Sequence, residues 1–118
     1  MITVTPRGRN VIIKAITDQL KHVHLFTDDG EVTGYEYQPI RLDSNKWKDG
    51  VYPDIVFQFG GGEAKQLRGW YMTNEDGFVV LNESFDITKE DEELGRYRLG
   101  RVGAKVIISP ILNLITGG

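Results

Sequence analysis

Two histidines separated by one residue are the side chains of this sequence best suited to hold a metal ion. On a strand, His22 and His24 would project from the same face, and they could chelate a cation if Asp28 or Asp29 came near. The chain contains two histidines, no cysteine and no third ligand at a fixed spacing. We therefore interpret the pair as solvated or interfacial imidazoles, and we predict no metal and no other cofactor.

Paired acidic residues are the second group that could do chemistry. They occur at residues 28–29, 75–76 and 90–93. A glycosidase needs two carboxylates across a cleft, one of them kept protonated by burial. These acids fall in predicted turns, where water keeps them ionised. The serines also lack the G-x-S-x-G setting of a nucleophile. We predict that the protein is not an enzyme.

A basic stretch, GRYRLGRVGAK at residues 95–105, concentrates positive charge in a chain of net charge −3. On a strand, Arg96 and Arg98 would share one face. The glycines do not have the spacing of a phosphate-binding loop, and the net charge argues against a chain built to neutralise phosphates. We expect either a solvated stripe or pairing with an acidic protein surface, for example the 90–93 run of a neighbouring copy, and not a nucleic acid.

One segment near the N-terminus has helical periodicity. Four apolar residues fall at spacings of three and four: Ile12, Ala15, Ile16 and Leu20. Asn10 is a plausible N-cap. The sequence therefore predicts one amphipathic helix over about residues 10–21.

The remainder, from about residue 22 onward, has the alternation of short strands. HVHLFT at 22–27 precedes an Asp-Asp-Gly turn, and DIVFQF at 54–59 places Ile55, Phe57 and Phe59 on one face. GYEYQPIRL predicts a strand with Tyr35 and Tyr37 on one face, limited to an edge or interrupted by Pro39. A terminal strand has Val106 and Ile108 on one face. Residues 86–95 predict a loop or one helical turn, which Thr88 could cap and Gly95 could end.

The stretch LRGWYMTNEDGFVVLNESF predicts a β-hairpin at residues 67–85. Its Gly77 suits the left-handed position that ends a tight turn. Both strands carry apolar residues on two faces. Either the pair is central and covered on both sides, or one face, with Trp70 and Met72, meets another subunit, because tryptophan and methionine are enriched at interface centres.

Length and composition limit the possibilities further. With 118 residues and five to seven antiparallel strands, the chain predicts one mainly β domain over 1–118, a small β-sandwich with one N-terminal helix. No apolar run approaches the roughly 20 residues that span a bilayer, and the N-terminus lacks the apolar core of a signal peptide. We expect no membrane partner.

The order of these elements resembles a group of small tailed-bacteriophage virion proteins. The resemblance covers about residues 21–115 and includes an LFT strand, a Gly-aromatic pair, a Trp, an F-x-F strand, a G-x-Y-x-T strand with a Gly turn, and E-x-F. The matching residues are Leu25, Phe26, Thr27, Gly34, Tyr35, Trp47, Phe57, Phe59, Gly69, Tyr71, Thr73, Asp76, Gly77, Glu83 and Phe85. This chain departs from the pattern by Trp70, Met72, an acidic insert at 89–93 and the N-terminal helix.

The resemblance implies a structural protein of the virion, assembled in the host cytoplasm. The expected function is that of a capsid cement or decoration protein, which stabilises the shell through contacts with the major capsid protein and with copies of itself. The interface residues that we expect are Tyr35, Tyr37, Trp70, Met72, Arg96 and Arg98. The alternatives are a tail or head-to-tail connector component, or a β-sandwich that binds carbohydrate or a receptor through Trp47, Tyr52 and Trp70.

Overall fold

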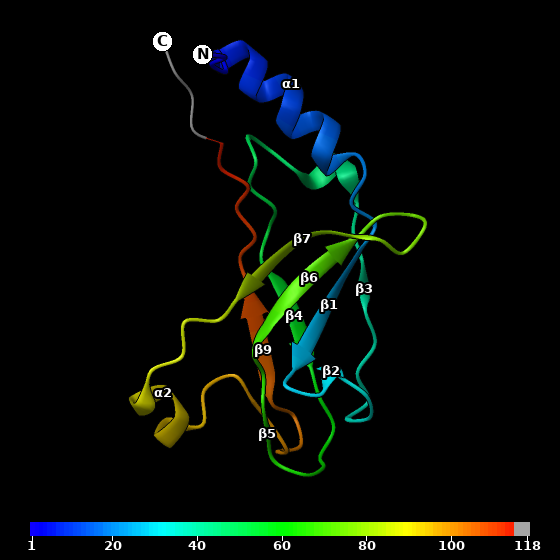
Figure 1. Cartoon of the computed structure of the whole chain (residues 1–118). Coiled ribbons are helices and arrows are strands. Elements are labelled where there is room, and N and C mark those ends of the chain that lie inside the picture. Colours follow the sequence, from blue (N-terminus) through cyan, green and yellow to red (C-terminus); the bar gives the residue numbers. More distant parts are fainter. Residues whose placement is uncertain (115–118) are drawn as a thin grey trace.

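A computed structural model describes residues 1–114, so the last four residues of the predicted domain, 115–118, lie outside the described part. The described chain is mainly β, with antiparallel sheets and an N-terminal helix (Figure 1). The longer strands are β1 (His22–Thr27), β4 (Ile55–Gln58), β6 (Gly69–Thr73), β7 (Val79–Ser84) and β9 (Lys105–Ile108). The two-residue strands are β2 (Gly30–Glu31), β3 (Ile40–Arg41), β5 (Lys65–Gln66) and β8 (Arg98–Leu99). The predicted fold class is confirmed.

The N-terminal helix, α1 (Pro6–Thr17), begins earlier and ends earlier than predicted. Thr5, rather than Asn10, is the N-cap, because its side-chain oxygen accepts the N–H of Gly8 at 2.9 Å and Pro6 occupies the first helical position. The predicted apolar face is confirmed at Ile16 and Leu20, whereas Ile12 and Ala15 are exposed. The residues that turn inward are Ile13, Ile16, Thr17 and, just beyond the helix, Leu20.

The larger sheet has the strand order β2-β1-β6-β7, with β3 paired to a separate part of β1. Leu25 pairs with Trp70 and Val23 pairs with Met72, and all four side chains are buried. The alternate residues of β1, which include His22 and His24, lie on the opposite face and are half-buried. This register confirms the predicted placement of the two histidines on one face.

A second sheet, β4 with β9, completes the sandwich. Its inward residues are Ile55 and Phe57 of β4 and Val106 and Ile108 of β9. They belong to the same apolar cluster as the buried residues of β1 and β6. Sheet faces with alternating apolar residues need this mutual cover. A third, two-stranded sheet joins β5 to β8.

The predicted strand through Tyr35 and Tyr37 is wrong except for its last residues, which form β3. Tyr35 and Glu36 have φ angles of 59° and 57°, a left-handed conformation that no strand adopts. The turn conformation lets the ring of Tyr35 lie against Gly62, where an added Cβ would be 2.7 Å from the ring. The need for close approach explains a glycine at this position.

The hairpin β6–β7 forms as predicted. Gly77 has a φ angle of 83°, and Asn74 closes the turn by accepting the N–H groups of Asp76 and Phe78. The register shifts between Met72 and Thr73, which marks a β-bulge. The hairpin places β7 at one end of the sheet order.

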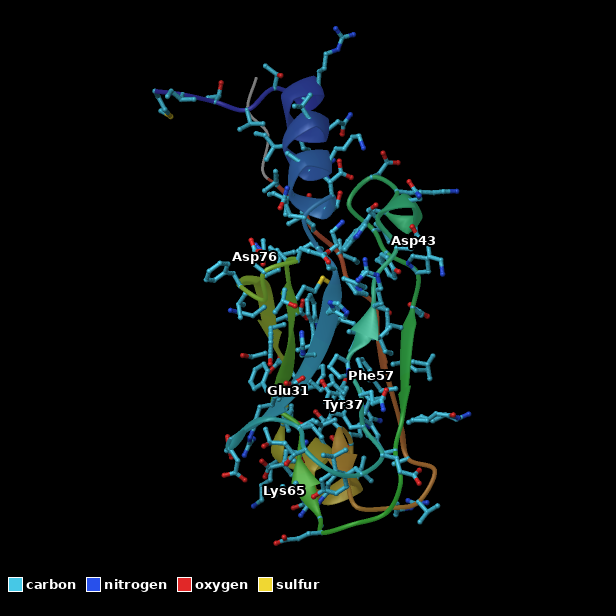
Figure 2. All side chains as sticks on the ribbon, turned by 90° about the vertical axis from the view of Figure 1, so that its right-hand side faces the viewer. Glu31, Tyr37, Asp43, Phe57, Lys65 and Asp76 are labelled. Carbon is cyan, nitrogen blue, oxygen red and sulfur yellow. The ribbon has the colours of Figure 1, made fainter. Side chains whose placement is uncertain are left out.

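The molecule is elongated, with extents of 49 × 31 × 23 Å. Its radius of gyration is 16.1 Å, compared with about 13.5 Å expected for a compact chain of this length. The helix α1 projects beyond one end of the sandwich (Figure 1). The hairpin turn with Asp76 and the 3₁₀ turn Ser44–Lys46, next to Asp43, lie toward the α1 end, and Lys65 lies at the opposite end (Figure 2).

Candidate functional site

The free edge of β7 is the first candidate for an interaction surface. In the described part of the chain, β7 pairs with β6 on one side and with no strand on the other. Phe78, in the turn just before it, and Val79 and Val80, at its beginning, are 69%, 57% and 39% exposed. An edge strand presents unpaired N–H and C=O groups, and exposed apolar side chains beside them make it a template for another strand. We call these three residues and β7 the open edge.

The opposite margin of the same sheet is closed by the chain itself. There β1 pairs with β2 at Phe26 and Thr27, and with β3 at His22 and Val23. Between the two short strands, the hydroxyl of Tyr37 accepts the N–H of Leu25 at 3.0 Å. The contrast between the two margins identifies β7 as the margin of this sheet that is open to strand addition.

A hydrogen-bond network on the outer face of the sheet centres on His24. The His24 Nδ1 atom lies 2.6 Å from Glu31 Oε2, and its Nε2 atom lies 3.0 Å from the hydroxyl of Thr73. The Tyr71 ring stacks on the imidazole at a centroid distance of 4.7 Å. Tyr37 donates its hydroxyl to the same Glu31 oxygen at 2.9 Å. Glu31 of β2 therefore bonds to β1 directly, through His24, and indirectly, through Tyr37, which accepts the N–H of Leu25.

Three side chains linked by hydrogen bonds, Thr73, His24 and Glu31, have the residue types of a nucleophile, base and acid. However, Thr73 is buried, and its hydroxyl is held by the imidazole, so a substrate does not reach it. Burial, followed by the negative charge of Glu31, raises the pKa of Tyr71. The arrangement holds His24 in one orientation and keeps the tyrosine neutral, which is a structural role.

The metal-binding arrangement weighed for the histidines does not form in the described residues. The carboxylates of Asp28 and Asp29 are engaged by Arg68, at 3.1 Å, and by Lys65, at 2.8 Å. Within residues 1–114, three or more potential metal ligands do not gather at any point. The Lys65 bond and charge hold the pKa of Asp29 below its ordinary value of 3.8. These acids bind cationic side chains instead.

A basic groove is the second candidate surface. It has a volume of about 820 Å³ and lies between the helix α2 (Lys89–Leu94), the strand β8 and the strand β9. Its cationic lining residues are Arg96, Arg98, Arg101 and Lys105. Exposed apolar residues line it as well, namely Leu94, Val102 and Ile107. We call this surface the basic groove.

The sequence predicts that Arg96 and Arg98 share one face of a strand, and this prediction is wrong. Both residues nevertheless line the basic groove. Tyr97, between them, has a φ angle of 52°, so the segment is not a continuous strand. The ring of Tyr97 stacks on Phe85 at a centroid distance of 4.3 Å. Arg96 then contacts Asp91 of α2 at 3.4 Å. A helix–turn–strand, rather than a strand face, brings the two arginines together.

The other predicted interface residues lie elsewhere. Trp70 and Met72 are buried in the core of the single chain, so the structure favours a central hairpin strand over an exposed face for them. Tyr35 donates its hydroxyl to the carbonyl of Glu63 at 2.6 Å. The hydroxyl of Tyr37 accepts the N–H of Leu25 at the margin of the larger sheet. The six predicted residues therefore do not form one surface.

The aromatic platform of the carbohydrate alternative is not exposed. Tyr52 and Trp70 are buried, and the half-buried Trp47 contacts Tyr52 edge-on at a centroid distance of 5.0 Å. Sequence reasoning missed the open edge. The signal was present in Phe78, Val79 and Val80, but the alternation that marks a strand does not say which strand ends a sheet.

Comparison of the chain with protein-family models, with curated proteins and with solved structures finds no match. The described residues also contain no helix with the length and apolar character needed to cross a membrane. The surfaces themselves are therefore the basis for an assignment.

Proposed function

We propose that this chain is a non-enzymatic structural protein that acts by assembly, and specifically a cement protein of a bacteriophage capsid. The open edge is the observation that carries the proposal. Exposed apolar residues beside unpaired backbone groups fit a protein whose sheet continues into a neighbouring molecule. The resemblance of the strand motifs to small virion proteins is the reason for proposing a bacteriophage capsid as the assembly.

Strand addition at the open edge would provide specificity and a modest affinity. Backbone hydrogen bonds fix the register, and full burial of each large apolar side chain contributes roughly 1.5–3 kcal/mol. Phe78, Val79 and Val80 are already partly buried, so covering them would offset only part of the cost of about 4–15 kcal/mol for association itself. A contact of this size suits a repeated array, in which many weak contacts act together.

Co-sedimentation with expanded phage heads that lack the protein tests the proposal. We expect saturable binding of the purified chain at a multiple of the symmetry-equivalent sites of the shell. A Val79→Lys substitution places a charge on the open edge and should abolish binding. The matched control is Val56→Lys, which changes another exposed valine, on β4.

Binding to tails instead of heads would move the assignment to a tail or connector component. Binding of Val79→Lys as tight as that of the unchanged protein would remove the open edge from the mechanism. Binding to glycans without binding to heads would favour the receptor-binding alternative and contradict the cement proposal.

A further inference from the structure

The basic groove carries a charge that the chain does not neutralise. Its four cationic lining residues face no acidic lining residue. Arg96 is paired with Asp91, whereas Arg98, Arg101 and Lys105 form no ion pair within residues 1–114. Because the whole chain has a net charge of −3, this concentration of positive charge is local. An anionic group is the occupant that fits it.

Apolar residues in the same groove narrow the class of occupant. Val102, Leu94 and Ile107 are 85%, 63% and 55% exposed. A single-stranded nucleic acid binds to aromatic platforms as well as cations, but the aromatic residue of this lining, Tyr97, is already stacked on Phe85. A protein surface that combines carboxylates with an apolar side chain matches both parts of the lining.

The chain itself carries such a surface on α2. Asp91 and Glu92 are engaged by side chains of the same molecule, with Asp91 on Thr88 and Arg96, and Glu92 on Arg68. Glu90 and Glu93 are exposed and have no ion-pair partner among the described residues. Three positions apart on a helix, they lie on one face, and the exposed Leu94 adjoins them.

The groove is large enough to receive a surface of the size of α2. A helix of six residues is about 9 Å long and about 10–12 Å across, which corresponds to roughly 700–1000 Å³. The basic groove has a volume of about 820 Å³. Figure 1 shows α2 beside the segment that leads into β9, so the acidic helix and the basic groove are neighbours on one molecule.

We propose that two copies of this chain associate about a two-fold axis, with α2 of each copy in the basic groove of the other. Because the helix borders its own groove, one two-fold axis near Leu94 brings both complementary contacts together at once. Glu90 and Glu93 of one copy meet Arg98, Arg101 and Lys105 of its partner. The apolar residues of the groove cover Leu94 of the partner copy. This interface is separate from the open edge and goes beyond the proposed function.

Sedimentation velocity of the full chain tests the interface. We expect a dimer at about 0.01 M salt, where charges act over about 30 Å, and weakening of about tenfold or more toward 1 M salt, where they act over about 3 Å. Arg98→Glu with Arg101→Glu should give a monomer, as should Glu90→Arg with Glu93→Arg. Thermal unfolding followed by circular dichroism verifies that both variants are folded.

The decisive measurement is sedimentation velocity of the two charge-reversed variants mixed together. Each variant repels itself, but in the mixture an acidic helix meets a basic groove, and a basic helix meets an acidic groove, so a one-to-one dimer should return. A monomeric unchanged protein, a dimer that survives either reversal, or a mixture that stays monomeric overturns the proposal. So does binding of a single-stranded oligonucleotide that is lost with the arginines while no dimer forms.

The test is independent of the capsid assignment. Val79→Lys should remain dimeric, and the charge-reversed variants keep an intact open edge. Loss of head binding with the dimer retained would therefore concern the proposed function, and loss of the dimer with head binding retained would concern this interface.

Discussion

At the scale of single residues, Tyr37 connects three parts of the fold. Its ring stacks near Phe57 of the facing sheet at a centroid distance of 6.0 Å, and its hydroxyl joins Leu25 to Glu31. Figure 2 shows Glu31, Tyr37 and Phe57 close together at mid-height of the molecule. Burial, opposed by the bond from Leu25 and aided by Glu31, raises the pKa of Tyr37 well above its usual range.

Replacing this hydroxyl should destabilise the chain. Tyr37→Phe leaves the buried N–H of Leu25 without its acceptor, and we expect a loss of about 1–3 kcal/mol in the free energy of unfolding at neutral pH. Urea titration measures the loss. The matched control is Tyr35→Phe, which removes only a donor to the carbonyl of Glu63. Equal losses in the two variants would contradict the role given to Tyr37.

The same residue predicts an alkaline pH dependence. Folding raises the pKa of Tyr37, so its neutral hydroxyl stabilises the folded state fully below pH 10, the ordinary pKa of tyrosine. This stabilisation is lost as the pH rises through the folded pKa. The free energy of unfolding should therefore fall above pH 10. The fall should be shallower in Tyr37→Phe than in the unchanged protein, as urea titrations at several pH values will show.

At the scale of elements, the short helix α2 depends on its caps. Thr88 and Asp91 form a capping box, and Gly95, with a φ angle of 73°, ends the helix. The bonds from the backbone and side chain of Thr88 hold the pKa of Asp91 below its ordinary value of 3.8. Local capping, rather than burial, therefore keeps the acidic face of α2 in place.

Removal of the cap should loosen α2 without unfolding the sandwich. Thr88→Ala should cost about 1 kcal/mol of local helix stability, visible as faster amide hydrogen exchange over residues 89–94. The control is the exposed Thr33→Ala, which should leave that exchange unchanged. Because the pKa of Asp91 is lowered, its stabilisation is present above pH 3.8 and is lost as the pH falls below that value. If neither Thr88→Ala nor protonation of Asp91 speeds amide exchange over residues 89–94, the capping argument is contradicted.

At the scale of the whole molecule, one apolar cluster joins the two sheets of the sandwich, while α1 packs at one end. The helix buries Ile13 beside Gly50, where an added Cβ would be 2.2 Å from the carbonyl oxygen of Leu112. Arg9 also donates to the carbonyl of Leu114 at 3.3 Å. The open edge and the basic groove share no residue.

The shared core predicts a global effect for one substitution. Trp70→Ala should lower the free energy of unfolding by about 3–5 kcal/mol, and amide exchange should accelerate in β4 and β9 as well as in β6. The contrasting variant is Ile13→Ala, whose effect should concentrate in α1. If Trp70→Ala unfolds with unchanged stability and fails only in assembly, the side chain serves an interface instead.

The sequence by itself determined the local features. Alternation defined β1 and β4, Gly77 defined the hairpin turn, and Thr88 and Gly95 marked the ends of a helical turn, because each depends on neighbouring residues alone. Only the tertiary structure decided that β7 lies at an open edge, that Trp70 is buried, and that Arg96 and Arg98 meet across a turned Tyr97. Strand order and side-chain cover arise from contacts between segments distant in the chain, which periodicity does not encode.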